Sequence, residues 1–384
     1  MDKFDFYNPV KILFGQGKIA AIADEIPTDA KVLMTYGCGS IKSNGVYEQV
    51  KTALSKHTVF EFGGIMPNPD LEILLDAIKL ARTEKITYLL AVGGGSVIDA
   101  TKFIAAAVPF SGEPWDILTA NASVCKALAL GVILTLPGTG SEMNSYFVIS
   151  RRETQEKLQT RSELVFPRFA ILDPTVTFSL PLNQISNGIV DSFCHVLEQY
   201  LTYPINAPLQ DRMAEAILLT LIVEGPKTLA DPTDYEARAN FMWCATLADN
   251  EFIGAGVPQD WATHTIAHEL TALYQLAHAE ALAVVLPSLL TYKRETKYNK
   301  LLQYARRGWG MKQDNEELQI DGAILATRTF FESVGVATHL KDYELDSACI
   351  KPIIKSLKKH GFITLGERQD IDLEDVGQIL SLSV

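Results

Sequence analysis

The pattern of strands and helices changes near residue 181, and this change limits the fold more than any other feature of the chain. Before residue 181, short runs rich in β-branched residues alternate with helical patterns. After it, the patterns are helical almost throughout. Alternating strands and helices favour a mostly parallel sheet with helices on both faces. The sequence therefore predicts an α/β domain over residues 1–180, followed by an all-helical domain over residues 181–384.

The predicted elements follow from hydrophobic periodicity and from the residues that break it. Pro174 and Pro181 interrupt regular structure at the boundary between the two parts. Strands are predicted over residues 31–36, 59–62, 87–92, 132–136 and 169–172, with helices over 70–82 and 96–107 between some of them. Helices are predicted beyond the boundary over residues 184–200, 209–223, 234–250, 264–274, 280–293, 297–307, 320–334 and 347–359.

The net charge and the cysteines indicate which partners and which cellular compartment to expect. A net charge of −12 and a pI of about 5.1 argue against a nucleic-acid partner or an anionic membrane surface. The five cysteines are scattered and form no CxxC motif, which favours a reduced, cytoplasmic chain. No signal peptide is recognisable, and no apolar run approaches the length of a transmembrane helix. We therefore expect a cytoplasmic protein that acts on small molecules.

One aspartate and four of the seven histidines suggest a metal site. Asp191 and His195 lie four residues apart in an apolar run, and on a helix this spacing places both side chains on one face. His264, His268 and His278 follow. A carboxylate and imidazoles within apolar segments suit a divalent metal such as Zn²⁺ or Fe²⁺, since burying them without a partner is costly. The alternative is an ordinary hydrogen-bonded Asp–His pair.

A glycine loop, Gly93-Gly94-Gly95-Ser96, joins a predicted buried strand to a predicted helix. Glycines let backbone N–H groups approach a pyrophosphate closely, and the start of a helix favours negative charge. The spacing is not that of the GxGxxG fingerprint. Ser96 and Asp99 also match a capping box approximately, and capping is the alternative or additional interpretation. Gly93, Gly94, Gly95, Ser96 and Asp99 are thus candidate cofactor-binding residues.

Two other loops support a dinucleotide site. Thr135, Thr139 and Ser141 place hydroxyls around a glycine turn after the strand predicted to end at residue 136, although such a turn can also be merely polar.

The strand predicted over 31–36 leads into Gly37, Gly39 and Ser40, with Lys42 nearby. NAD-specific sites usually place a carboxylate there for the ribose 2′-hydroxyl, and none occurs between Lys31 and Tyr47. This favours NADP(H) over NAD(H), unless Lys42 is an exposed lysine without a role.

These motifs together resemble the iron-containing (group III) alcohol dehydrogenases. The resemblance rests on GGGSVIDATK at 93–102, TLPGTGSE at 135–142, the Asp191/His195 pair and the spacing of His264, His268 and His278. It extends from PVKILFG at residues 9–15 to at least Pro287. The segment GVPQDWATH at 256–264 is similar to bacterial NADPH-dependent aldehyde reductases of the butanol-dehydrogenase type.

The resemblance implies a fold and a site. The fold is dehydroquinate-synthase-like, with a Rossmann-like dinucleotide-binding N-terminal domain and a helical C-terminal domain. The implied metal ligands are Asp191, His195, His264 and His278, for Fe²⁺ or Zn²⁺, and His268 would stand near nicotinamide and substrate as a proton relay. These five residues are the expected catalytic set. Lys157 would contact the cofactor, and the protein would form a homodimer.

One departure from the family pattern concerns the last ligand. The family commonly has a Gly-x-Pro-His-Gly turn, whereas residues 275–280 read QLAHAE. A single straight helix from His264 to His278 would separate the two residues by roughly 21 Å, too far to share an ion. We therefore expect the chain to turn between Tyr274 and His278.

The function implied by the resemblance is metal-dependent, NADP(H)-linked hydride transfer between nicotinamide and short- to medium-chain aldehydes or primary alcohols. A glycerol or polyol dehydrogenase that uses NAD on the same scaffold is an alternative, as is a related lyase. A metallohydrolase is a more distant one, because Thr265 rather than Glu follows His264, so the HExxH order is not met. A non-catalytic nucleotide-binding protein is the remaining alternative.

Overall fold

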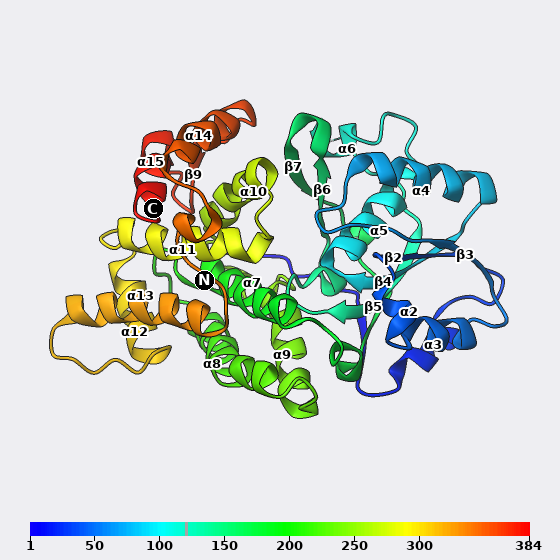
Figure 1. Ribbon diagram of the computed structural model, residues 1–384, viewed down its shortest axis with the longest axis horizontal. Helices are drawn as coiled ribbons and strands as arrows, with labels where there is room; N and C mark the ends of the chain where they lie inside the picture. Colours follow the sequence, from blue (N-terminus) through cyan, green and yellow to red (C-terminus); the bar gives the residue numbers. More distant parts are fainter. Residues whose placement is uncertain (120–121) are drawn as a thin grey trace. The chain divides into compact units, whose positions relative to one another are not determined.

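The computed structural model describes residues 1–119 and 122–384. The chain forms two compact units (Figure 1). Tyr7–Leu180 and Pro232–Thr246 form the first, called the sheet unit below, and Met1–Phe6, Pro181–Asp231 and Leu247–Val384 form the second, called the helical unit. The change in pattern near residue 181 therefore coincides with a change of unit. Two segments are exceptions: residues 1–6 belong to the helical unit although they precede residue 181, and residues 232–246 belong to the sheet unit although they follow it.

The sheet unit contains a six-stranded parallel sheet of order β1-β8-β5-β4-β2-β3 (Figure 1). Its strands are β1 (Lys11–Phe14), β2 (Lys31–Tyr36), β3 (Thr58–Phe62), β4 (Tyr88–Gly94), β5 (Ala129–Leu136) and β8 (Phe169–Leu172). Five of them were predicted, β2 and β8 with the observed bounds. Strand β1 and an antiparallel hairpin, β6 (Tyr146–Arg151) and β7 (Glu156–Arg161), were not predicted.

Helices cover both faces of this sheet, as predicted. They are α1 (Ile22–Glu25), α2 (Ser40–Ser43), α3 (Val46–Ala53), α4 (Leu71–Glu84), α5 (Gly95–Ala107) and α6 (Asp116–Thr119). Side chains alternate along each strand, so Leu33 and Leu89 pack with α4 and α5 in one core. Val32 and Leu90 pack with α1–α3 in the other. Burial on both faces explains why β4 and β5 are continuously apolar.

The helical unit is built from long helices with short connections. They are α7 (Leu182–Tyr200), α8 (Pro208–Ala230), α10 (Ala262–Tyr274), α11 (His278–Tyr292), α12 (Tyr298–Arg307), α13 (Glu316–Ser333), α14 (Ile350–Lys359) and α15 (Leu373–Ser381). Helix α9 (Tyr235–Ala248) lies mostly in the sheet unit. The all-helical prediction omitted α15 and one two-residue strand pair, β9 (Thr364–Leu365) and β10 (Ile371–Asp372).

Short 3₁₀ helices complete the chain: η1 (Lys18–Ala21), η2 (Ser141–Met143), η3 (Arg152–Thr154), η4 (Glu163–Val165), η5 (Pro174–Thr177), η6 (Leu340–Tyr343) and η7 (Ser347–Cys349). Within the described residues, no helix has both the length and the apolarity that crossing a lipid bilayer requires.

Candidate active site

Helix α7 carries the first two residues of the candidate metal site. Every residue of α7 from Gly188 to Tyr200 is buried, its polar residues included. Asp191 and His195 lie one turn apart on one face, as their spacing predicts. Glu198, three residues beyond His195, continues the same face and is also buried. An apolar helix therefore presents three ionisable groups to one side.

A turn between α10 and α11 brings the histidines of these helices together. Helix α10 ends at Tyr274, Gln275 takes a left-handed conformation with φ of 61°, and α11 begins at His278. The turn expected between Tyr274 and His278 is thus confirmed. Its sequence signal was weak because glutamine seldom adopts positive φ, where glycine or asparagine is usual.

The side chains of Asp191, His195, His264 and His278 converge in the helical unit. One ligand atom from each of Asp191, His195 and His264 lies within 4.8 Å of the others. Asp191 Oδ1 is 3.7 Å from His195 Nδ1 and 3.8 Å from His278 Nε2. The His264 ring centroid is 4.6 Å from that of His195 and 5.2 Å from that of His278.

His268 lies beside this group. Its ring centroid is 5.1 Å from that of His278 and 6.5 Å from that of His264. Asp191, His195 and His264 are buried, whereas the His278 side chain is 23% exposed. The group is therefore most accessible on the side of His278 and His268.

The spacing of these atoms fits a divalent cation better than a hydrogen-bonded cluster. Ligand atoms about 2.1 Å from a tetrahedral ion lie roughly 3.4 Å apart. The distances of 3.7 and 3.8 Å around Asp191 Oδ1 are near this value and too long for hydrogen bonds. Among the residues that the structure describes, Asp191 Oδ1 and His195 Nδ1 are buried and have no hydrogen-bond partner. A buried carboxylate oxygen in this state is costly unless an ion satisfies it.

The three candidate cofactor loops follow three neighbouring strands. Strands β2, β4 and β5 are parallel and adjacent, so the loops at 37–40, 93–96 and 137–141 leave the same edge of the sheet. In open α/β sheets, ligands bind beyond the carboxyl ends of the strands. The residues predicted from separate motifs therefore lie at one edge of the sheet unit.

The glycines of the 93–96 loop are required by close packing and not by helix capping. The N-cap of α5 is Gly94, and no side chain of the described residues caps the helix, so the suggested Ser96/Asp99 capping box is wrong. The Ser96 hydroxyl instead accepts a hydrogen bond from the Asn68 N–H at 3.3 Å. A Cβ on Gly95 would lie 2.4 Å from Thr139 Oγ1, and one on Gly93 would lie 2.5 Å from a Val97 methyl carbon. The loop thus needs glycine to pack against its neighbours.

The substitution Gly95→Ala is expected to displace the loop that carries Thr139. The added methyl group must push Thr139 aside, and overpacking of this kind costs about 1–3 kcal/mol of stability. We also expect the KM for NADPH to rise roughly 10-fold, because the backbone N–H groups at the start of α5 move. The double variant Gly95→Ala/Thr139→Ala should recover stability, since it removes the clashing Oγ1 and Cγ2 atoms. An unchanged KM alongside lost stability would mean that the glycine is structural only.

Asp99 and Ser141, two of the candidate cofactor-binding residues, are hydrogen-bonded to each other. Ser141 Oγ donates to Asp99 Oδ1 at 2.6 Å, and the Val148 N–H donates to Asp99 Oδ2 at 3.0 Å. Burial raises the pKa of the Asp99 carboxyl, although the nearby charges of Lys102 and Lys157 act in the opposite direction. Lys157, on β7, is thus close enough to influence the Asp99 carboxyl electrostatically.

Lys102, which received no role from the sequence, is the centre of this cluster. It is fully buried, and its ammonium donates to Ser141 Oγ and Asn144 Oδ1 at 2.9 Å each and to the Tyr146 carbonyl at 2.8 Å. Lysine is rarely buried without such partners. The signal that could have identified it is its spacing of three residues from Asp99 in an otherwise apolar helix.

The 37–40 loop, which follows β2, contains Gly37, Gly39 and Ser40. Gly39 has φ of 105°, a conformation that favours glycine, and Ser40 begins α2. The Lys42 ammonium lies over the rings of Tyr36 and Tyr47, at 5.1 and 5.3 Å from their centroids. Lys42 is therefore held by two aromatic rings at this end of β2.

Glu198 is the second residue that sequence reasoning missed. Its Oε1 accepts a hydrogen bond from the Thr263 N–H at 2.7 Å, and its Oε2 contacts His264 Nδ1. Burial, and next the charge of Asp260, raise the pKa of Glu198. A cation on the far side of the His264 ring would favour the charged form of this carboxyl. Its spacing from Asp191 and His195 on one helix face was the available signal.

Comparisons with known proteins give consistent matches over the whole chain. The family model "Iron-containing alcohol dehydrogenase" matches residues 9–174, and "Fe-containing alcohol dehydrogenase family, C-terminal" matches residues 185–384. The chain is 54% identical to the NADPH-dependent aldehyde reductase YqhD of Escherichia coli over 377 residues, 97% of each chain. It is 39% identical to a probable NADH-dependent butanol dehydrogenase of Bacillus subtilis over all of both chains. The crystal structure of E. coli YqhD superposes with a TM-score of 0.99 at 52% identity, covering 100% of this chain and 99% of that one.

Proposed function

This chain belongs to the iron-containing alcohol dehydrogenase family, and we propose that it is a metal-dependent, NADP(H)-linked aldehyde reductase and alcohol dehydrogenase. The family and the fold predicted from the motifs are confirmed. The observation that carries the proposal is the convergence of one buried carboxylate and three imidazoles, with the Asp191 oxygen lacking any hydrogen bond among the described residues. We propose short- to medium-chain aldehydes and primary alcohols as substrates.

Asp191, His195, His264 and His278 would hold the metal. A bound divalent cation supplies Lewis acidity toward a carbonyl or alcohol oxygen. One carboxylate and three imidazoles are ligands that suit both Fe²⁺ and Zn²⁺, and we propose one of these two ions. The partial exposure of His278 supports approach of the substrate oxygen from that side, because the other three ligands are buried.

The loops of the sheet unit would bind NADP(H), which supplies or accepts the hydride. The backbone of Gly93, Gly94 and Gly95 and the start of α5 would take the phosphates, with the hydroxyls of the 137–141 loop beside them. Ser40 and the neighbouring glycines would face the adenosine ribose, and Lys157 would contribute positive charge. Relatives of both nicotinamide types occur, so the preference for NADP(H) rests on the missing carboxylate after β2.

His268 would hold the proton that the reaction exchanges with the substrate oxygen. It lies beside His278 at the accessible side of the group, and imidazole exchanges protons readily near neutral pH. A homodimer in the cytoplasm is also proposed, the dimer from the family resemblance and the location from five cysteines that form no disulfide.

The direct test is the oxidation of NADPH by the purified protein with butanal. We expect turnover with butanal and NADPH, slower turnover with NADH, and loss of both after chelation. Faster oxidation of glycerol with NAD⁺ would favour the polyol dehydrogenase alternative. Hydrolysis of esters or amides without nicotinamide would favour a metallohydrolase.

The substitution Ser40→Asp is expected to reverse the preference for NADPH. Ser40 is exposed at the start of α2, so a carboxylate there is tolerated, repels a 2′-phosphate and can accept a hydrogen bond from a 2′-hydroxyl. The ratio of kcat/KM for NADPH over NADH should fall roughly 10- to 100-fold. Ser55→Asp, which adds the same charge at an exposed position after α3, should leave this ratio unchanged. Equal ratios in both variants would remove Ser40 from the cofactor site.

A further inference from the structure

A buried carboxylate, Glu198, lies directly behind the candidate metal ligand His264. Both of its oxygens meet groups in the first turn of α10: Oε1 accepts from the Thr263 N–H at 2.7 Å, and Oε2 contacts His264 Nδ1. The Glu198 side chain is 2% exposed, so water does not compete for these contacts. One side chain of α7 thus fixes both the backbone that carries His264 and the imidazole itself.

This contact determines which ring nitrogen of His264 faces the other ligands. A neutral imidazole carries one N–H and one lone pair, and Glu198 in the charged form that a bound cation favours can only accept. The proton therefore belongs on Nδ1, and the lone pair of Nε2 is directed away from Glu198. A cation held by Asp191, His195 and His264 needs this lone pair.

A second set of contacts holds the backbone just before His264. The Asp260 N–H donates to the Glu198 carbonyl at 2.9 Å, and Asp260 Oδ1 accepts from the Ala262 N–H at 3.0 Å. Between them, Trp261 has φ of 61°, which is uncommon for a bulky residue and persists only where surrounding contacts impose it. The entry into α10 is therefore held in a strained conformation by Glu198 and Asp260.

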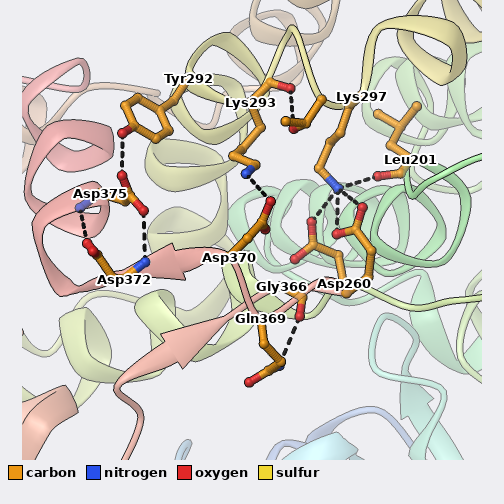
Figure 2. Close-up of polar contacts among 12 residues, drawn as sticks. Leu201, Asp260, Tyr292, Lys293, Lys297, Gly366, Gln369, Asp370, Asp372 and Asp375 are labelled. Carbon is orange, nitrogen blue, oxygen red and sulfur yellow. Dashed lines mark hydrogen bonds and ion pairs between the residues drawn. The ribbon is translucent and has the colours of Figure 1, made fainter.

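A buried lysine, Lys297, compensates the negative charge of the carboxylates near the start of α10. Lys297 Nζ lies 2.7 Å from Asp260 Oδ2 and 2.7 Å from the Leu201 carbonyl (Figure 2). It also lies 2.9 Å from Glu367. The Lys297 side chain is 1% exposed. Burial lowers its pKa, but the charges of Asp260 and Glu367 outweigh this, and the resulting pKa is raised. Lys297 therefore pairs with two carboxylates, one of which, Asp260, supports the start of α10.

We propose that Glu198 is a positioning residue that orients the His264 imidazole for the metal, with Asp260 and Lys297 holding the turn that carries it. This inference rests on the proposed function, because it requires that His264 bind the metal. Carboxylates that accept from a ligating histidine typically affect metal affinity or activity by about 10- to 100-fold. Glu198 acts through His264 and need not touch the substrate.

The test compares Glu198→Gln with the wild-type protein and with Glu215→Gln. Glu215 is a buried glutamate of α8 that accepts from the Tyr200 hydroxyl and the Gln303 amide, so the control makes the same change away from His264. Metal-free proteins are titrated with Co²⁺ against a chelator, and the visible spectrum of bound Co²⁺ is recorded. We expect Glu198→Gln to weaken Co²⁺ binding about 10- to 100-fold and to alter the spectrum, while Glu215→Gln matches the wild type.

Kinetics add a readout that a general loss of stability would not produce. With saturating metal, Glu198→Gln should lower kcat for butanal while the KM for NADPH stays unchanged, because Glu198 belongs to none of the cofactor loops. If Glu198→Gln does not fold, Glu198→Asp decides, since it keeps the buried charge but withdraws it from the imidazole. Weaker Co²⁺ binding is again expected, and unchanged affinity and spectrum in the folded variant would overturn the proposal.

Different outcomes contradict the proposed function and the role of Glu198. A wild-type protein that binds no Co²⁺, or that does not oxidise NADPH with butanal, contradicts the proposed function. A wild-type protein that does both, with Glu198 variants indistinguishable from it, removes only the role of Glu198.

Discussion

Replacing Asp191 with Asn is expected to lower kcat/KM for aldehyde reduction by about 10³-fold or more. Asp191 is the only anionic group among the four candidate ligands, and its Oδ1 faces both His195 and His278. A neutral amide of the same shape is a much weaker ligand, so the metal is lost or held in the wrong geometry. Metal content of the purified variant and NADPH oxidation with butanal measure the effect.

The same variant should retain its fold, because Asp191 is expected to serve the metal site and not the stability of the core. Asp191 Oδ1 is buried and has no hydrogen bond among the described residues, so without metal its charge is a cost to the folded state. We therefore expect metal-free Asp191→Asn to unfold at the same temperature as the metal-free wild type or a higher one. Asp211→Asn, at a part-buried carboxylate of α8 that pairs with Lys300 at 2.5 Å, should keep its metal and its activity. An active, metal-replete Asp191→Asn protein would contradict the assignment.

Replacing Lys102 with Met is expected to produce the largest loss of stability in the sheet unit, about 3–5 kcal/mol. The ammonium donates three hydrogen bonds, and its charge lowers the pKa of both Asp99 and Glu142, which burial raises. Methionine fills a similar volume but withdraws the Lys102 donor from three acceptors, of which Asn144 Oδ1 keeps the Tyr146 N–H at 3.1 Å, and it leaves two buried carboxyls without their cation. Chemical denaturation of the two proteins gives the difference in the free energy of unfolding.

Lys102→Met should also weaken NADPH binding, because Ser141 and Asn144 lose the group that fixes their loop. Lys79→Met, at an exposed position of α4, is a matched control that should change neither stability nor the KM for NADPH. A stability within about 1 kcal/mol of the wild type would show that Lys102 does not organise this cluster.

The sequence could predict those parts of the fold that depend on local pattern. Strands β4 and β5 are buried on both faces, so their apolar runs were unambiguous. Strand β1 is only partly buried, unlike the equally short β8, and β7 carries Glu156, Lys157 and Arg161, so neither has a strong apolar signal. The inclusion of Met1–Phe6 in the helical unit depends on contacts such as Phe6 with Phe252, which are distant in sequence.

The candidate site, like the fold, could be predicted only in part from the sequence. Residue types and short spacings indicated a metal site that includes Asp191, His195, His264 and His278. The family resemblance implied that these four residues are the ligands. The turn that brings His278 back to Asp191 has a glutamine at positive φ, which no propensity predicts. Glu198 and Lys102 were missed because their roles come from partners on other elements, Thr263 and His264 for Glu198 and Asn144 and Tyr146 for Lys102.

Reduction of the aldehyde is expected to depend on one divalent cation held by Asp191, His195, His264 and His278. Titration of metal-free protein with Fe²⁺ or Zn²⁺, followed by NADPH oxidation with butanal, tests it most directly. We expect no turnover before metal is added, a linear rise of the rate with added metal, and a plateau at one ion per chain. Full turnover by protein that is verified to be metal-free would contradict it.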